Sequence, residues 1–295
     1  MKNKSFFTAV NHHVFLLIIG LLFISCAQNK EAKTSWILGL QPNEATRDVT
    51  SLETKLKSKS KLPLKIVISS SYQETVEQLK TAKIDFAVLS PLNLIQAEKE
   101  MDVKVLLKKV YGDSEFYFSA ILVGQKSKIK SLKDLENKKI AFVDPQSASG
   151  FLYPHAMLKK AGVDWTKVQA LFLGTHTKAV EALLKGEVDA AAVWADDPQK
   201  NQGAWTAAEI PEAQRTHLKV LKYSDPIPND AIVVRGDIHK AHPEEVLKFM
   251  DAFIDLSDDP DKILKEVFGV DKLTTATSRH YDVVRELDKL MKEEK

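Results

Sequence analysis

Short apolar runs rich in β-branched residues alternate with amphipathic stretches along most of this 295-residue chain. The stretches between the runs have apolar residues every three or four positions, which is typical of helices that cover one face of a sheet. The predicted strands are Trp36–Leu40, Leu64–Ser69, Ile84–Leu89, Val103–Val110, Phe116–Val123, Ile140–Val143, Ala170–Leu173, Ala190–Val193, Leu218–Tyr223 and Ala231–Arg235. The predicted helices are Asn43–Lys57, Tyr72–Ala82, Pro91–Glu100, Phe151–Ala161, Thr177–Lys185 and almost all of 243–295, with breaks at 257–260 and 274–277. This alternation predicts an α/β fold built on largely parallel sheets.

Two β-rich segments have no helix inside them, one around Phe116–Val123 and one at Leu218–Arg235. We interpret them as crossings between two lobes, which predicts a ligand cleft between the lobes. The predicted division is a signal peptide at 1–25, a tether at 26–35, the first part of lobe 1 at 36–118, lobe 2 at 119–224, and the return of lobe 1 with C-terminal helices at 225–295.

The start of the chain has the features of an export signal. Lys2 and Lys4 precede an apolar run of eleven residues, Val14–Ile24, which as a helix would span only ~16 Å of a bilayer core of ~30 Å. A basic start, a short apolar run and the small residue Ser25 predict a cleaved signal peptide. Cys26 follows directly, and the residues before it resemble a bacterial lipobox, so we expect Cys26 to carry the lipid that anchors the mature chain outside the cytoplasm.

The amino-acid composition argues against several classes of protein. The chain has 42 Lys and Arg against 40 Asp and Glu, so it lacks the basic surplus of a nucleic-acid-binding protein. Its single cysteine excludes a disulfide framework and a multi-cysteine metal site. His239 and His242 have the spacing of metal ligands but no evident third ligand. We therefore expect no metal or cofactor. We also expect the protein to be a monomer.

Four predicted strand-to-helix turns carry hydroxyl groups, at Ser69–Tyr72, Ser90–Asn93, Asp144–Gly150 and Gly174–Thr177. Helix N-termini expose unpaired N–H groups and a partial positive charge, which suit oxyanions. In open α/β sheets such turns gather at the carboxyl ends of the strands. Each serine or threonine alone is better explained as a helix cap than as a ligand contact. Together the turns favour an anion site and make Ser90 a candidate ligand contact.

Longer motifs resemble the phosphate/phosphite/phosphonate group of ABC-transporter substrate-binding proteins. They are Phe116–Val123, Ile129–Leu135, Ala141–Pro154 with its Ser-x-Ser-Gly, Gly174–Val180, Gly186–Asp196, and Asp225–Arg235 with its Ile-Pro-x-Asp. The similarity covers about residues 36–255. It implies a two-lobed periplasmic-binding-protein fold of type II, an extracytoplasmic location, a small phosphorus-oxyanion ligand and a membrane permease as partner.

The resemblance also implies roles for individual residues. Ser147, Ala148 and Ser149 match the family's Ser-Thr-Ser that grips the oxyanion, with Ala148 lacking the hydroxyl of the family's threonine. His176 matches a histidine that contacts the same oxygens, and Tyr72 and Tyr117 match tyrosines that line the cleft. Trp194 either packs its own strand or walls the pocket.

Asp196 and Asp230 match two acidic residues that hold the ammonium group of aminoalkylphosphonates in this family. Asp196 is one methylene shorter than the glutamate of those binders. A carboxylate beside an oxyanion costs Coulomb energy unless a cation or proton intervenes. An aminated ligand would supply the cation, and a monoprotonated phosphite would supply the proton. Phosphonate, phosphite and phosphate all remain open at this point.

The predicted function is capture of a phosphorus oxyanion by closure of two lobes, for delivery to an importer. A sensory lipoprotein that reports the ligand to a membrane kinase would use the same closure, so the sequence leaves that alternative open. An exported enzyme is a weaker alternative, because no nucleophile elbow, zinc motif or glycine-rich cofactor loop occurs. We therefore expect binding without catalysis.

Overall fold

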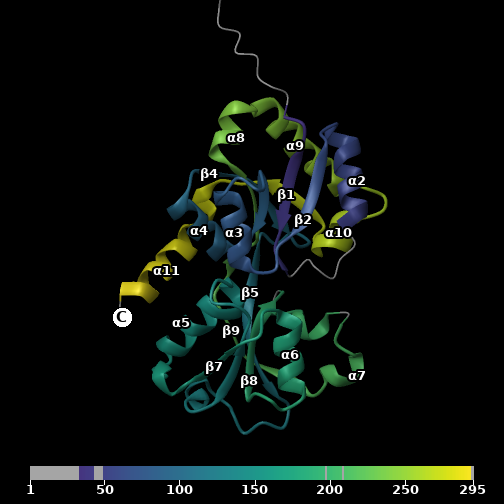
Figure 1. Cartoon of the computed structure of the whole chain (residues 1–295). Coiled ribbons are helices and arrows are strands. Elements are labelled where there is room, and N and C mark those ends of the chain that lie inside the picture. The colour runs from purple at the N-terminus through teal and green to yellow at the C-terminus, as the bar shows by residue number, and fades with distance from the viewer. Residues whose placement is uncertain (1–32, 43–48, 197, 208, 294–295) are drawn as a thin grey trace, which may run out of the picture. The chain divides into compact units, whose positions relative to one another are not determined.

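The computed structural model describes residues 33–42, 49–196, 198–207 and 209–293 (Figure 1). The predicted signal peptide, Cys26 and most of the tether lie outside these residues, as do the first six residues of the predicted helix Asn43–Lys57. The described residues form two six-stranded sheets covered by helices.

The first sheet has the strand order β12-β4-β11-β3-β1-β2. Its strands are β1 (Trp36–Leu40), β2 (Leu64–Ile68), β3 (Phe86–Leu89), β4 (Val103–Val110), β11 (Ala231–Arg235) and β12 (Lys272–Thr275). Strand β1 is parallel to β2 and β3, while β11 runs antiparallel to both β3 and β4. In this sheet the expectation of largely parallel pairing is therefore right only for β1, β2 and β3.

The second sheet has the path β10-β5-β8-β6-β7, with β9 also paired to β5. Its strands are β5 (Phe116–Gly124), β6 (Lys139–Phe142), β7 (Gln169–Phe172), β8 (Ala190–Ala195), β9 (Leu218–Tyr223) and β10 (Ile227–Pro228). Strand β6 is parallel to β7 and β8, and β5 is antiparallel to β8, β9 and β10. The lobe boundaries predicted after residues 118 and 224 fall inside β5 and just before β10.

Helices cover both faces of each sheet, so the central strands β3 and β8 are buried at almost every position. They are α2 (Val49–Ser60), α3 (Tyr72–Lys80), α4 (Pro91–Glu100), α5 (Tyr153–Lys160), α6 (His176–Leu184), α7 (Glu212–Arg215), α8 (Gly236–Ala241), α9 (Pro243–Asp255), α10 (Ile263–Phe268) and α11 (Asp282–Glu293). On β3, Phe86 and Val88 pack in the core with α2 and α9, whereas Ala87 and Leu89 pack in the core with α3 and α4. On β5, Ala120 and Leu122 pack in the core with α6, whereas Ile121 and Val123 pack in the core with α5.

The C-terminal part of the chain differs from its predicted structure in one element. Residues 272–275, which overlap the expected helix break at 274–277, form β12 and pair antiparallel with β4. A four-residue run between helices carries too little alternation to identify a strand. Its pairing partner, β4, lies far away in the sequence, so the edge of the sheet decides the conformation of this segment.

Candidate functional site

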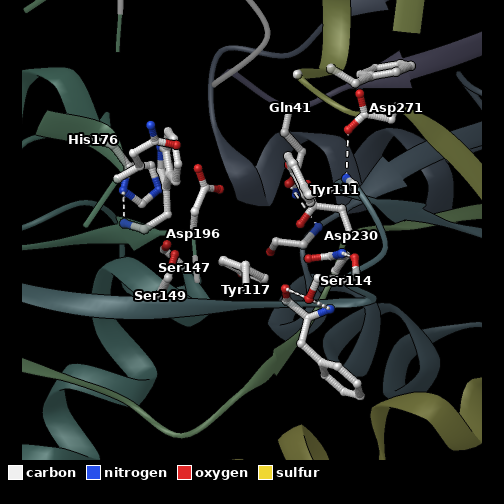
Figure 2. A pocket seen from close by; sticks show the side chains of 18 of the residues that line it. Gln41, Tyr111, Ser114, Tyr117, Ser147, Ser149, His176, Asp196, Asp230 and Asp271 are labelled. Atoms are coloured by element: carbon white, nitrogen blue, oxygen red, sulfur yellow. Dashed lines mark hydrogen bonds between the residues drawn. The ribbon is translucent and has the colours of Figure 1, made fainter. Parts of the chain in front are cut away.

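A cavity of ≈ 340 Å³ lies between residues of the two sheets, at the ends of several strands and the starts of several helices. Eight of the nine predicted ligand-binding residues line it: Tyr72, Ser90, Tyr117, Ser147, Ser149, His176, Asp196 and Asp230. Figure 2 shows Ser147, Ser149 and His176, called here the donor wall, on one side of this cavity. Gln41, Tyr111 and Asp230, called here the opposite wall, lie across from them.

The donor wall begins at a helix start that follows β6. Ser147 is the N-cap residue, and its Oγ accepts a hydrogen bond of 3.0 Å from the N–H of Gly150. The N–H groups of Phe151 and Leu152 donate to the carbonyl oxygen of Ser147. The first turn therefore leaves the N–H groups of Ala148 and Ser149 without a protein acceptor within the part of the chain that the structure describes. The Ser147 hydroxyl keeps its own proton for donation to a ligand.

Ala148 is the one predicted contact whose side chain does not line the cavity. It is 1% exposed and packs with Leu152 and Tyr153 against the first-sheet core beneath α3 and α4. Its methyl group therefore helps to hold the helix start against the other half of the molecule. A ligand contact from Ala148 would come from its backbone N–H alone.

Ser149 is fixed by two neighbours on β5. The hydroxyl of Ser119 donates to the carbonyl oxygen of Ser149 at 2.6 Å. The phenol of Tyr117 is hydrogen bonded to the Ser149 side chain. Burial raises the pKa of Tyr117 well above its usual value of 10, and the charge of Asp230 acts in the same direction. Tyr117 is therefore protonated and able to donate a hydrogen bond.

His176, the first residue of α6, has a defined protonation state. The backbone N–H of Trp194 donates to Nδ1 of His176 at 3.1 Å, so the ring proton lies on Nε2. Burial lowers the pKa of His176 to about 3. The imidazole is thus a neutral Nε2–H donor at physiological pH. The helix is capped separately by Thr175, whose Oγ accepts from the N–H of Lys178.

A hydrogen-bond network joins the opposite wall to the donor wall. The Gln41 side chain accepts from the N–H of Ser90 at 3.0 Å and donates to Oδ1 of Asn93 at 2.6 Å. Asn93 then donates to Oε1 of Gln146, the residue before the N-cap Ser147, also at 2.6 Å. The Ser90 side chain makes no capping hydrogen bond to its own helix. Its hydroxyl donates instead to Oδ1 of Asn93. These contacts link the helix starts of the two halves directly.

Asp230 is paired with a lysine that the sequence reasoning did not identify. Nζ of Lys109 on β4 lies 3.1 Å from Oδ2 of Asp230. The neighbouring Asn229 donates from Nδ2 to the carbonyl oxygens of Lys109 and Ser114, which fixes the orientation of its amide. Its Oδ1 is buried without a hydrogen-bond partner among the described residues. The signal in the sequence was the pair of adjacent lysines, Lys108 and Lys109, inside β4. Successive residues of a strand face opposite sides of the sheet, so both lysines are buried where helices cover both faces.

Trp194 near the end of β8 and Asp196 just after that strand both line the cavity. The N–H of Asp196 donates to the carbonyl oxygen of Gln202 at 2.9 Å, which holds this segment against the following loop. Trp194 is half-buried and packs on the core under α6 while it walls the cavity. Both interpretations of Trp194 from the sequence therefore apply.

The part of the chain that the structure describes lacks two further features. There, no group of three or more His, Cys, Asp or Glu side chains is arranged to hold a metal ion. Within the same residues no helix has the length and apolar character needed to cross a bilayer.

The family of periplasmic substrate-binding proteins of phosphonate ABC transporters matches residues 35–281. The chain belongs to this family. Its function is therefore that of an extracytoplasmic substrate-binding protein in ABC transport, as the motifs predicted. The predicted two-lobed α/β fold is likewise confirmed.

Individual relatives agree with this membership. The chain is 30% identical over 139 residues to the phosphate-import protein PhnD of Mycolicibacterium smegmatis, a match that spans 43% of each chain. It is 24% identical over 230 residues to the probable phosphite-binding protein PhnD1 of Prochlorococcus marinus, covering 74% of this chain and 75% of that protein.

Solved structures show the same fold. The PhnD1 structure from Prochlorococcus marinus in complex with methylphosphonate has a TM-score of 0.76 at 17% identity, covering 88% of this chain and 98% of that chain. A binding protein of an ABC phosphonate transporter from Pseudomonas aeruginosa has a TM-score of 0.73 at 19% identity, covering 87% of this chain and 86% of that chain. At these identities the likeness shows the fold alone.

Proposed function

We propose that this protein binds a phosphorus oxyanion, a phosphonate or phosphite, at the donor wall and delivers it to a membrane permease by closing its two lobes. The observation that supports this proposal best is the concentration of hydrogen-bond donors on that wall. Two hydroxyl groups, two backbone N–H groups and the neutral Nε2–H of His176 surround one part of the cavity. Hydrogen bonds to an ionised acceptor are about twice as strong as neutral ones.

The binding role also explains the network between the walls. Gln146 belongs to the loop that carries Ser147, and Asn93 belongs to α4 beside the opposite wall. A ligand held by Ser147 and reached by Tyr117 would add further bonds between the same two halves. Closure of lobes around a ligand needs contacts of this kind, which form in the closed state and favour it. We propose capture without catalysis.

A ligand panel tests the proposed function. Thermal unfolding with and without methylphosphonate, phosphite, phosphate and sulfate should show a rise in Tm with at least one phosphorus oxyanion. A ligand at a hundred times its Kd stabilises the folded state by about 2.7 kcal/mol. Sulfate is the control for any tetrahedral anion. Equal shifts for sulfate and every phosphorus compound, or no shift at millimolar concentrations, would contradict the proposal.

We further propose that Cys26 is acylated and anchors the protein to a membrane. Residues 27–35, which follow it, are mostly polar or small, and each buried CH₂ of an acyl chain contributes about 0.8 kcal/mol to membrane attachment. Cys26→Ser is therefore expected to move the exported protein from the membrane fraction to the soluble fraction, and mass spectrometry of the wild-type N-terminal peptide should show the acyl mass. An unmodified Cys26 in the mature protein would refute the anchor. The wild-type protein in the same fractionation is the control.

A further inference from the structure

Lys109 is a buried lysine directly behind the part of the cavity wall that carries Asp230. Its side chain is 1% exposed, and its Nζ lies 3.1 Å from Oδ2 of Asp230. The same Nζ lies 4.7 Å from the centroid of the Phe268 ring. Asp230 and Phe268 line the cavity, whereas Lys109 does not. An ammonium group held between a carboxylate and an aromatic face is fixed in place, because both attract it and water is excluded.

The family resemblance assigns the carboxylate of Asp230 to the ammonium group of an aminated ligand. In this chain Lys109 already supplies the cation for that carboxylate. A ligand ammonium placed against Asp230 would meet a second positive charge within a few ångströms, and like charges at such distances are costly where water is scarce. For a ligand without an ammonium group the effect reverses, because Lys109 cancels the repulsion between Asp230 and the oxyanion.

Besides Asp230, the cavity is lined by two carboxylates and two ammonium groups. Asp271 pairs with Lys265 at 3.2 Å, and both residues line the cavity. Asp196 and Lys200 also line the cavity. With Lys109 and Asp230 included, the carboxylates and the ammonium groups at the cavity are equal in number, at three each. We propose that Lys109 makes this cavity selective for phosphorus oxyanions that carry no ammonium group, such as methylphosphonate and phosphite, and selective against aminoalkylphosphonates. This inference rests on the proposed function, since it requires the oxyanion to bind at the donor wall.

The experiment compares methylphosphonate with 2-aminoethylphosphonate by calorimetry in the full mature chain. The wild-type protein should bind methylphosphonate at least about tenfold more tightly. In Lys109→Met the bare carboxylate of Asp230 repels the oxyanion and accepts an ammonium group. The preference for methylphosphonate should therefore fall by about tenfold or reverse. Lys109→Met with Asp230→Asn replaces the ion pair by neutral groups of similar size, and should keep the wild-type order of the two ligands.

Lys108→Met is the matched control. Lys108 is the neighbouring residue on the same strand, has a side chain only 3% exposed and pairs with Glu115, but it does not line the cavity. Its replacement should leave the ligand preference unchanged. The inference is overturned if wild-type protein prefers 2-aminoethylphosphonate, a result that does not depend on any variant folding, or if folded Lys109→Met keeps the wild-type preference. If no phosphorus compound binds the wild-type protein, the proposed function fails instead.

Discussion

Replacing Ser147 and Ser149 together by alanine is expected to weaken binding of the phosphorus ligand by about a hundredfold, or ~3 kcal/mol. Both hydroxyls lie on the donor wall, and the oxyanion would keep only the two backbone N–H groups and His176 there. Hydrogen bonds to charged groups contribute ~1.5–3 kcal/mol each, so two lost donors account for this loss. Calorimetry on both proteins with the best ligand of the panel measures it directly.

The Ser147 substitution also removes a helix cap, which costs ~0.5–2 kcal/mol of folding stability. Ser71→Ala is the matched control, because the Ser71 hydroxyl caps α3 in the same way and does not line the cavity. It should lower Tm without changing affinity. Ser149→Ala alone should weaken binding with a smaller loss of Tm, since Ser149 caps no helix and the bond from Ser119 goes to its carbonyl oxygen, which the substitution keeps. Unchanged affinity in the double variant would show that the ligand binds elsewhere.

The sequence predicted most of the fold because its strands are short apolar runs separated by clear helical periods. The ten predicted strands all have counterparts, from β1 to β9 and at β11. Strand β10 was missed because it has only two residues, and β12 because its sequence, Lys272–Thr275, is mostly polar and lies between helices. The parallel pairing was overestimated, because β11 and β5 pair with strands from distant parts of the chain.

The candidate site was predictable where its residues belong to local patterns. The donor wall comes from two helix starts, and each helix start is visible as a short hydroxyl-containing turn. Lys109 was not predictable in this way, because it lies 121 residues from Asp230 and only the pairing of β4 with β11 brings them together. The contact between Asn93 and Gln146 spans 53 residues and depends on the packing of the two halves. Such residues follow from the fold and not from a motif.

Gly150 determines how closely the donor wall can approach the end of β6. A Cβ atom at this position would lie 2.5 Å from Cβ of Val143 and 2.8 Å from Oγ of Ser147. The Val143 Cβ cannot rotate away, since it is attached directly to the backbone. Ser147 cannot move without losing its hydrogen bond to the N–H of Gly150. The glycine of the Ser-x-Ser-Gly motif is therefore required by packing.

Gly150→Ala is accordingly expected to destabilise the protein by about 1–3 kcal/mol, the usual cost of overpacking, and to weaken ligand binding because the helix start must shift. Gly124→Ala is the matched control, because a Cβ there meets no atom within 4 Å and the residue lies at the end of β5. Thermal unfolding and calorimetry on both variants should show losses of Tm and affinity for Gly150→Ala only. Wild-type values for both quantities in Gly150→Ala would mean that the donor wall is not held by this contact. A loss of Tm with unchanged affinity would separate the packing of the helix start from ligand binding.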